Sequence, residues 1–195
     1  MSDLKAIKKR LRMEALARRD AMDETARIEA SLEIAAHGTA LLADAVRGRI
    51  VSGFLPIRSE VDLRPLMTAL ADHGARLCVP AIVDKELEFR ELKRGAELVD
   101  QGFGTVAPGP DAAVLVPGIM LVPLSAFDRQ GGRIGYGGGF YDRAIQRFET
   151  DGARPRLVGT AFAVQEIEKA PMASHDHFLD AVVTEAGVIE PRSRT

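Results

Sequence analysis

Residues 118–143 have the sequence GIMLVPLSAFDRQGGRIGYGGGFYDR, in which an apolar segment, a glycine-rich loop and the start of a helix follow one another. The apolar part, 118–124, has the composition of a buried strand. After residue 140, apolar side chains recur at helical spacing, so a helix is expected directly behind the glycines. This order is typical of α/β proteins, which bind ligands beyond the carboxyl ends of their strands.

The glycine-rich loop predicts an anion site. Glycines have no Cβ, so the backbone can adopt positive φ and bring its amide groups close to a ligand. The helix start adds a partial positive charge, which favours a phosphate there. Asp142 and Arg143 fall in the first turn, where a carboxylate can bind a divalent cation and a guanidinium can bind phosphate. The alternative is a mobile surface turn, although a linker would lack the interleaved Arg, Tyr and Phe side chains.

Two known phosphate-loop signatures do not match this segment. The dinucleotide pattern GxGxxG, started at Gly135, requires a glycine where Phe140 stands. The chain also contains no Gly-Lys pair, which excludes a Walker A loop. A nucleotide site in this loop therefore belongs to another class.

The composition limits the possible number of domains and the possible classes of binding partner. A chain of 195 residues that is 46% hydrophobic and 28% charged is expected to form a single domain over 1–195. Its net charge of −2 argues against a nucleic-acid partner. The sequence contains no apolar run long enough for a membrane span, so we expect a cytoplasmic protein without membrane contact. The single cysteine, Cys78, is interpreted as a core residue and not as a reactive thiol.

Helical and strand patterns alternate along the chain. An apolar stripe with basic residues elsewhere indicates a first helix, and Asp23 is the predicted N-cap of the second. The interval 49–79 has the pattern of a β-α-β unit. The expected helices are 4–19, 24–42, 63–73 and 140–148, and the expected strands are 49–55, 76–79, 87–92, 118–124, 156–162 and 181–184.

This order predicts an α/β fold, a single-domain three-layer sandwich with a mostly parallel central sheet and helices on both faces. Parallel neighbours need crossover connections, and the intervening helices supply them. The segment 87–92 is the expected edge strand, and 108–110, Pro-Gly-Pro, is the expected connector to the central strand. The glycine-rich loop follows a strand that ends near Leu124, which places it at the ligand-binding edge of the sheet.

The block Arg-Ile-Gly-Tyr-Gly-Gly-Gly-Phe-Tyr-Asp-Arg, residues 133–143, resembles the signature of the 5-formyltetrahydrofolate cyclo-ligase family, also called 5,10-methenyltetrahydrofolate synthetases. The resemblance runs nearly end to end. Its weaker supporting pieces are Lys8 and Arg12, the segment 54–62 that ends in Ser-Glu-Val-Asp, Leu121-Val-Pro-Leu with Phe127-Asp128, His175-Asp176, and Asp180 before Val183-Thr184-Glu185.

The resemblance implies an ATP-dependent, Mg²⁺-requiring ring closure. In that reaction 5-formyltetrahydrofolate becomes 5,10-methenyltetrahydrofolate, with release of ADP and phosphate. The formyl oxygen is a poor leaving group, so it must be phosphorylated before N10 closes onto the formyl carbon. Such catalysis depends on positioning and charge neutralisation and needs no protein nucleophile.

By the same resemblance, Lys8, Arg12 and Arg133 are the catalytic cations, which surround the ATP phosphates along the loop. Lys8 and Arg12 are four residues apart and so share one helix face. The alternative is a solvated basic face, because Lys5 and Lys9 have the same spacing. The residues implied in ATP binding are Lys8, Arg12, Arg133, Ile134, Gly135, Tyr136, Gly137, Gly138, Gly139, Phe140 and Tyr141.

The resemblance also implies a folate site, in which Glu60 accepts hydrogen bonds from the pterin N–H groups. The alternative is that Glu60 is an ordinary loop carboxylate. Two departures affect the details of the folate contacts: Leu63 stands where threonine is expected, and Ala107 where an acid is expected. The implied substrate-binding residues are Phe54, Glu60, Tyr136, Gly137, Gly138, Gly139 and Phe140, although some of the apolar and aromatic ones are expected to be plain core.

Asp142 and Asp180 are the implied Mg²⁺ ligands, and for Asp180 an ordinary strand-edge acid is the alternative. His175 and His177 have a His-x-His spacing that can bind zinc. The sequence offers no third and fourth ligand with suitable spacing, so this segment is interpreted as a solvated loop.

The expected partner is a small molecule, 5-formyltetrahydrofolate with or without a polyglutamate tail, and the expected protein is a monomer. Two other classes stay open. A non-catalytic folate- or nucleotide-binding relative would take up ligand without forming ADP. An enzyme acting on phosphosugars or CoA thioesters on a similar scaffold would work without ATP.

Overall fold

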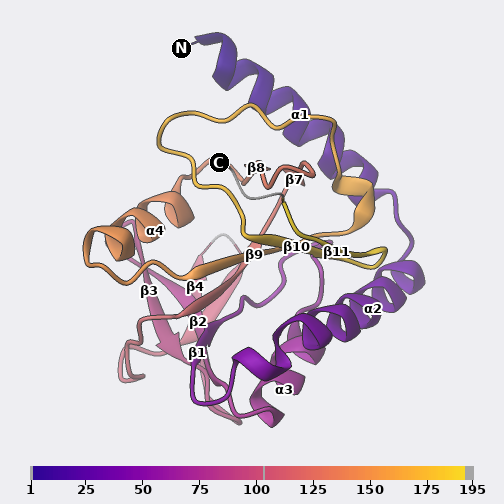
Figure 1. Ribbon diagram of the computed structural model, residues 1–195. Coiled ribbons are helices and arrows are strands. Elements are labelled where there is room, and N and C mark those ends of the chain that lie inside the picture. Colours follow the sequence, from indigo (N-terminus) through magenta and orange to yellow (C-terminus); the bar gives the residue numbers. More distant parts are fainter. Residues whose placement is uncertain (1, 103, 192–195) are drawn as a thin grey trace.

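A seven-stranded sheet forms the centre of the molecule, in the order β11-β10-β9-β6-β1-β2-β3 (Figure 1). The computed structural model describes residues 2–102 and 104–191. The inner strands are parallel, and both edge strands, β3 and β11, are antiparallel to their neighbours. The strands are β1 (Ile50–Ser52), β2 (Arg76–Val83), β3 (Glu86–Glu91), β6 (Ile119–Pro123), β9 (Arg156–Thr160), β10 (Ala181–Thr184) and β11 (Gly187–Ile189).

Helices cover both faces of this sheet, which confirms the predicted three-layer α/β sandwich. In Figure 1, α2 and α3 lie on one side and α4 on the other, while α1 lies apart from these layers. In the part of the chain that the structure describes, no helix is long and apolar enough to cross a membrane. The helices are α1 (Ser2–Asp20), α2 (Glu24–Leu42), α3 (Arg64–Asp72) and α4 (Phe140–Thr150), with short 3-10 turns η1 (Ala43–Ala45) and η2 (Ala163–Gln165).

The central strand β6 is buried on both faces. Ile119 and Leu121 pack in the cluster shared with α2 and α3, and Met120 and Val122 pack in the cluster shared with α4. This is the two-residue alternation of a strand, with both faces apolar, as a parallel sheet between helix layers requires. Cys78 is fully buried in the second cluster, and burial raises the pKa of its thiol to about 12. The interpretation of this cysteine as a core residue is confirmed.

Several boundaries differ from the prediction. The strand expected over 49–55 ends at Ser52. At Gly53 the chain passes so close to α3 that a Cβ there would lie 2.1 Å from the Met67 sulfur. The strand expected over 76–79 continues to Val83 and forms a hairpin with β3. Asp84 and Lys85 at the hairpin tip both have positive φ, as a type I′ turn requires.

Three structural features were not predicted. A two-stranded sheet is formed by β4 (Leu98–Gly102) and β5 (Thr105–Pro108), so Pro108 ends a strand where a connector was expected. The strand β11, which was also not predicted, is added at one edge of the central sheet. Inside the segment 118–143, the pair β7 (Ala126–Phe127) and β8 (Arg133–Ile134) forms a small antiparallel ladder at the base of the glycine-rich loop.

The topology reverses between β1 and β6. These strands are neighbours, but the chain leaves β1 toward α3 and β2, and leaves β6 toward α4 and β9 on the opposite face. Ligands of open α/β sheets bind outside the carboxyl ends of the strands at such a point. Here the segments 53–63 and 124–139 meet, so the topology places the glycine-rich loop at the expected ligand edge.

Candidate functional site

The glycine-rich loop is anchored at its base and open at its tip. The β7–β8 ladder holds its start, and the Arg12 Nε of α1 donates to the Gly135 carbonyl at 2.6 Å. Residues 136–138 are exposed, and the Gly138 carbonyl accepts a hydrogen bond from the Arg143 guanidinium at 2.9 Å. Gly137 has φ 97° and Gly139 has φ 67°, a region in which side-chain-bearing residues are strained. Gly139 occupies the N-cap position of α4 and has no side chain to cap the helix, so the amides of the first turn remain available to an anion.

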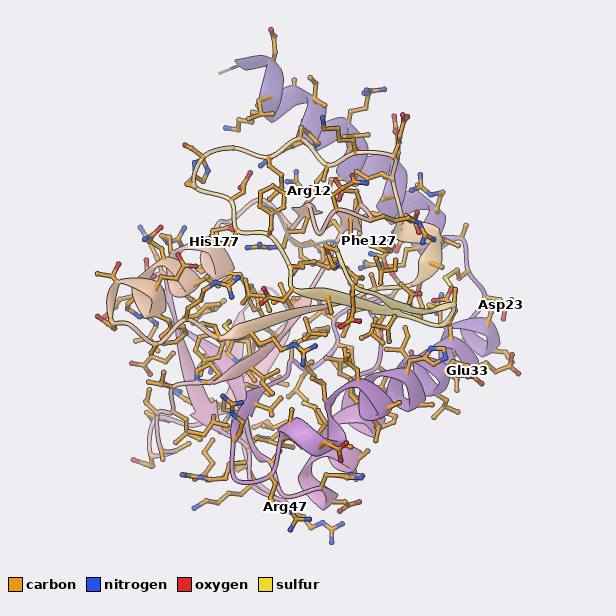
Figure 2. All side chains as sticks on the ribbon, in the orientation of Figure 1. Arg12, Asp23, Glu33, Arg47, Phe127 and His177 are labelled. Carbon is orange, nitrogen blue, oxygen red and sulfur yellow. The ribbon has the colours of Figure 1, made fainter. Side chains whose placement is uncertain are left out.

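Two basic residues of α1 lie beside this loop. The Arg12 guanidinium is 3.2 Å from the position that a Cβ on Gly137 would occupy, and Figure 2 shows Arg12 on the side of α1 that faces the rest of the fold. Partial burial lowers the pKa of Arg12. Lys8, one turn earlier, forms an ion pair with Asp176 of the loop after β9. The structure thus brings both predicted cations of α1 to the glycine-rich loop or its surroundings.

Arg133 and Asp142 form an ion pair immediately behind the loop. The Arg133 side chain is only 5% exposed, and its Nη1 atom has no hydrogen-bond partner among the described residues. Burial lowers the pKa of Arg133, while the charges of Asp142 and Asp176 oppose that shift. Because a buried cation with a free N–H group is strongly disfavoured unless it is paired, the unpaired N–H of Arg133 marks a place where an anion would be stabilised.

Asp142 continues into a chain of polar contacts. The His177 backbone amide donates to Asp142 Oδ1 at 3.4 Å, and the His177 ring Nε2 lies 3.2 Å from Glu149. His177 lies beside α4 in Figure 2, and burial lowers the pKa of its ring. Glu149 also pairs with Arg154, which binds Asp180 at 3.2 Å. This chain holds α4 and the loop that contains His177 together.

The two predicted metal ligands have different surroundings. The Asp142 carboxylate is 27% exposed and lies next to the open loop. Asp180 is bound by Arg154 and accepts a hydrogen bond from the Leu157 amide at 2.7 Å, at the start of β9. In the described ranges, no group of three or more His, Cys, Asp or Glu side chains is arranged to hold a metal ion. His175, of the His-x-His motif, is 77% exposed.

The predicted folate residues are divided between the surface and the core. Phe54 is 4% exposed and packs in the α2–α3 cluster, so its side chain is part of the core. Glu60 accepts a hydrogen bond from the Ile57 amide at 2.9 Å. Burial raises the pKa of Glu60, although hydrogen bonds from the Tyr136 side chain and the Ile57 amide act to lower it. Tyr136 is 38% exposed at the tip of the loop, and Phe140 is half-buried below it.

The other residues expected to contact ATP lie deeper. Ile134 is 2% exposed and packs in a small cluster with Ala126 and Ala15. Tyr141 has a buried hydroxyl with no hydrogen-bond partner among the described residues, and burial raises its pKa. The structure therefore places their side chains behind the loop, and contact with a ligand there would be made by the backbone.

Four residues at the site were not assigned a role by the sequence. Asp128 accepts hydrogen bonds from the amides of Gln130, Gly132 and Ala170, which fixes the turn before the loop. His177 and Asp176 link the loop after β9 to Asp142 and Lys8. Arg19 is buried at the end of α1. The sequence could have indicated Arg19, because positions 8, 12 and 19 follow the spacing of a single helix face.

Comparisons with known proteins agree on one family. Residues 4–185 match the model of the 5-formyltetrahydrofolate cyclo-ligase family. A 5-formyltetrahydrofolate cyclo-ligase of Escherichia coli K12 is 34% identical over 152 residues, which cover 74% of this chain and 82% of that protein. A protein of the same name from Mycolicibacterium smegmatis is 29% identical over 149 residues, which cover 71% of this chain and 75% of that protein.

Two solved structures share the fold. The structure of Aquifex aeolicus 5,10-methenyltetrahydrofolate synthetase superposes with a TM-score of 0.81 at 27% identity, covering 97% of this chain and 95% of that one. A 5,10-methenyltetrahydrofolate synthetase from Mycoplasma pneumoniae gives a TM-score of 0.73 at 19% identity, covering 91% of this chain and 98% of that one. The second match supports the fold alone.

Proposed function

This chain belongs to the 5-formyltetrahydrofolate cyclo-ligase family, and on that premise we propose that it converts 5-formyltetrahydrofolate and ATP into 5,10-methenyltetrahydrofolate, ADP and phosphate. The proposed reaction phosphorylates the formyl oxygen and then closes N10 onto the formyl carbon.

The observation that carries the proposal is the set of groups around residues 135–139. Exposed loop amides, the start of α4 and the guanidinium of Arg12 surround one small region, and the unpaired N–H of Arg133 lies behind it. Each of these groups donates hydrogen bonds or carries positive charge. A polyphosphate is the ligand class that this combination favours, and charge stabilisation of a transferring phosphoryl group is the chemistry it supports.

Mg²⁺ is proposed as the metal, with Asp142 as its protein ligand. In proteins Mg²⁺ is usually bound by one or two carboxylates together with substrate phosphates and water, so it does not need a cluster of acids. Asp142 fits that pattern, because its half-buried carboxylate lies beside the loop that would hold the phosphates. When bound, the ion neutralises charge on the transferring phosphoryl group. A contribution from Asp180 would require its carboxylate to leave Arg154.

The folate is proposed to bind on the Glu60 side of the site. Glu60 would accept hydrogen bonds from the pterin N–H donors, and Tyr136 and Phe140 would offer aromatic surface to its rings. Glu60 is on the segment that follows β1, and the glycine-rich loop follows β6. The two substrates would thus meet across the β1–β6 reversal, with the formyl group between them.

The proposed reaction can be followed by ultraviolet absorbance. We expect the purified protein, given 5-formyltetrahydrofolate and MgATP, to produce the near-ultraviolet absorbance of the methenyl product together with one ADP per turnover. A folded protein that binds both ligands but forms neither product would be a non-catalytic binder. Turnover of a phosphosugar or CoA thioester without ATP would support the other alternative class.

Lys8 is expected to contribute to ATP binding. Replacing it with methionine should raise the KM for ATP by about tenfold or more, since a hydrogen bond to a charged group is typically worth about 1.5–3 kcal/mol. Lys9→Met is the matched control, because Lys9 is exposed on the same helix. Equal KM values for the two variants would show that the Lys8–Asp176 pair only fastens α1. Thermal melting of both variants would separate that fastening role from ligand binding.

A further inference from the structure

Arg19 is the most deeply buried charged side chain of α1, with 2% of its surface exposed. Arginine is almost never buried to this degree unless its charge is paired and its N–H groups are bonded. Its nearest carboxylate oxygen belongs to the exposed Asp20, at 3.6 Å from Nε. Among the described residues, the other partners of the guanidinium are two neutral hydroxyl groups, those of Ser59 and Tyr136. Burial of a charged side chain in the last turn of α1 is costly, so the contacts that Arg19 makes there need an explanation.

The Arg19 guanidinium joins two segments that are far apart in the sequence. Its Nη1 donates to the Tyr136 hydroxyl at 2.8 Å, and its Nε donates to the Ser59 hydroxyl at 3.0 Å. Its Cζ also lies 5.9 Å from the centre of the Tyr136 ring. Ser59 in turn donates to Asp20 and precedes Glu60 in the chain. One side chain therefore fixes both the segment after β1 and the tip of the glycine-rich loop.

Arg19 is well separated from the cations next to the proposed phosphate site. It follows Arg12 by seven residues, or about 10 Å along the helix axis. Seven residues are close to two full turns, so both side chains leave α1 on the same face. That face therefore has two parts, one at Lys8 and Arg12 beside the loop base, and one at Arg19 beside Tyr136 and Ser59.

We propose that Arg19 is a positioning residue for the folate: it sets the spacing between Tyr136 and the Ser59–Glu60 segment, which form two walls of the pterin site. This inference rests on the proposed function and deepens it. The planar guanidinium is suited to the task, because its N–H groups point in fixed directions toward two hydroxyl groups at once. Its charge also favours the ionised form of Glu60, against the burial that raises the pKa of that carboxyl group.

The chemical class that this site would select is a fused ring with adjacent N–H donors, as in the pterin of a reduced folate. Glu60 supplies the acceptor oxygens, and the Tyr136 ring supplies an aromatic face. Arg19 itself does not need to touch the ligand. Its loss should therefore weaken folate binding, through misplaced walls, more than it weakens ATP binding, because the loop remains held at Gly135 by Arg12.

The experiment compares Arg19→Met and Arg19→Lys with Arg18→Met. Arg18 is the adjacent arginine, it is exposed, and within the described residues it donates hydrogen bonds to the carbonyls of Val164 and Glu166. We expect both Arg19 variants to weaken the equilibrium binding of 5-formyltetrahydrofolate, measured without nucleotide, by about tenfold or more, because the Tyr136 and Ser59 hydroxyl groups lose the charged donor that holds them in place. The KM for ATP should change by a clearly smaller factor than the folate affinity, and Arg18→Met should keep both values.

Lysine at position 19 is the informative substitution. It keeps the charge but lacks the fork that reaches two hydroxyl groups, so a role in general charge balance alone would be rescued by Arg19→Lys, and this result would overturn the proposal. Equal losses of folate and ATP binding would also overturn it, because they would indicate general damage to α1 docking. Wild-type folate affinity in Arg19→Met would also overturn the proposal.

Two further measurements keep the outcome decisive. If the Arg19 variants do not fold, Ser59→Ala removes one of the two bonds at a half-buried position, and it should also weaken folate binding selectively. Unchanged folate affinity in Ser59→Ala would then count against the proposal. Titration of the wild-type protein with 5-formyltetrahydrofolate tests the premise. No binding there would refute the proposed function itself, whereas normal wild-type binding with insensitive variants would refute only the role of Arg19.

Discussion

Asp142→Asn should lower kcat by about a thousandfold, because stabilisation by a metal ion is typically worth several kcal/mol and each 1.4 kcal/mol corresponds to a factor of ten. Asparagine keeps an oxygen that can accept the hydrogen bond from Arg133, but it loses the charge that Mg²⁺ requires. The measurement is the rate of methenyl product formation at saturating ATP and folate, over a range of Mg²⁺ concentrations. A higher Mg²⁺ requirement with partial rescue at high Mg²⁺ is the expected signature.

The surroundings of Asp142 decide the choice of variant. Asp142→Ala would leave the 5% exposed Arg133 guanidinium without its carboxylate, and an unpaired buried charge typically costs about 3–5 kcal/mol of stability. The alanine variant is therefore expected to lose both stability and activity, while the asparagine variant separates the two. Asp151→Asn is the matched control, at an exposed aspartate at the other end of α4. A low rate with an unchanged Mg²⁺ dependence would assign Asp142 to orienting Arg133 alone.

Gly137→Val should raise the Kd for ATP by about thirtyfold or more, because the loss of charge-assisted phosphate contacts is worth about 1.5–3 kcal/mol and steric blocking adds to it. A Cβ at this position would lie 3.2 Å from the Arg12 guanidinium, so the valine would displace Arg12 as well as cover the loop amides. Its φ of 97° adds strain. Nucleotide titration and thermal unfolding of the same variant would report binding and stability separately.

The control for backbone strain is Gly152→Val. Gly152 also has a positive φ, at 72°, and a Cβ there would meet nothing within 4 Å. Both valine variants should lose about 1–2 kcal/mol of stability from the left-handed backbone, and Gly137→Val alone should lose ATP affinity. If the two variants lost stability equally and neither lost ATP affinity, the loop would be a structural turn and not a phosphate site.

The long periodic segments could be predicted from the sequence. Helix α2 begins after the N-cap that the sequence indicated, since Asp23 accepts a hydrogen bond from the Ala26 amide at 2.9 Å. The apolar run of β6 is central in the sheet, and the β-α-β unit is present as β1, α3 and β2. These elements are fixed by local rules of capping and burial, which a single sequence contains.

The elements that were missed depend on contacts distant in sequence. Strands of two residues, such as β7 and β8, are too short to show any period. The predicted end of β2 at Val79 was reasonable, because the next residue, Pro80, has no N–H to donate to a neighbouring strand. In the structure the pairing with β1 has already ended at Cys78, so Pro80 is tolerated while β2 continues beside β3. That register follows from the tertiary arrangement of the strands.

The candidate site shows the same division. The glycine-rich loop, Arg133 and Asp142 could be predicted because they adjoin one another in the sequence and resemble a family signature. The contacts of Asp176 and Arg19 could not be predicted, because each has a partner more than a hundred residues away, Lys8 for Asp176 and Tyr136 for Arg19. Sequence periodicity places Arg19 on a helix face but does not reveal what that face meets.

Helix α1 has a consequence for the order in which the enzyme becomes competent. Residues 2–20 are synthesised before their partners, because Arg12 and Arg18 bind the carbonyls of Gly135 and Val164, which follow them by 123 and 146 positions. The sheet core can assemble from segments closer in sequence, so docking of α1 is expected to be a late step of folding. A nascent chain that ends before about residue 135 would then contain α1 without the loop that Arg12 binds, so the proposed nucleotide site would still be incomplete.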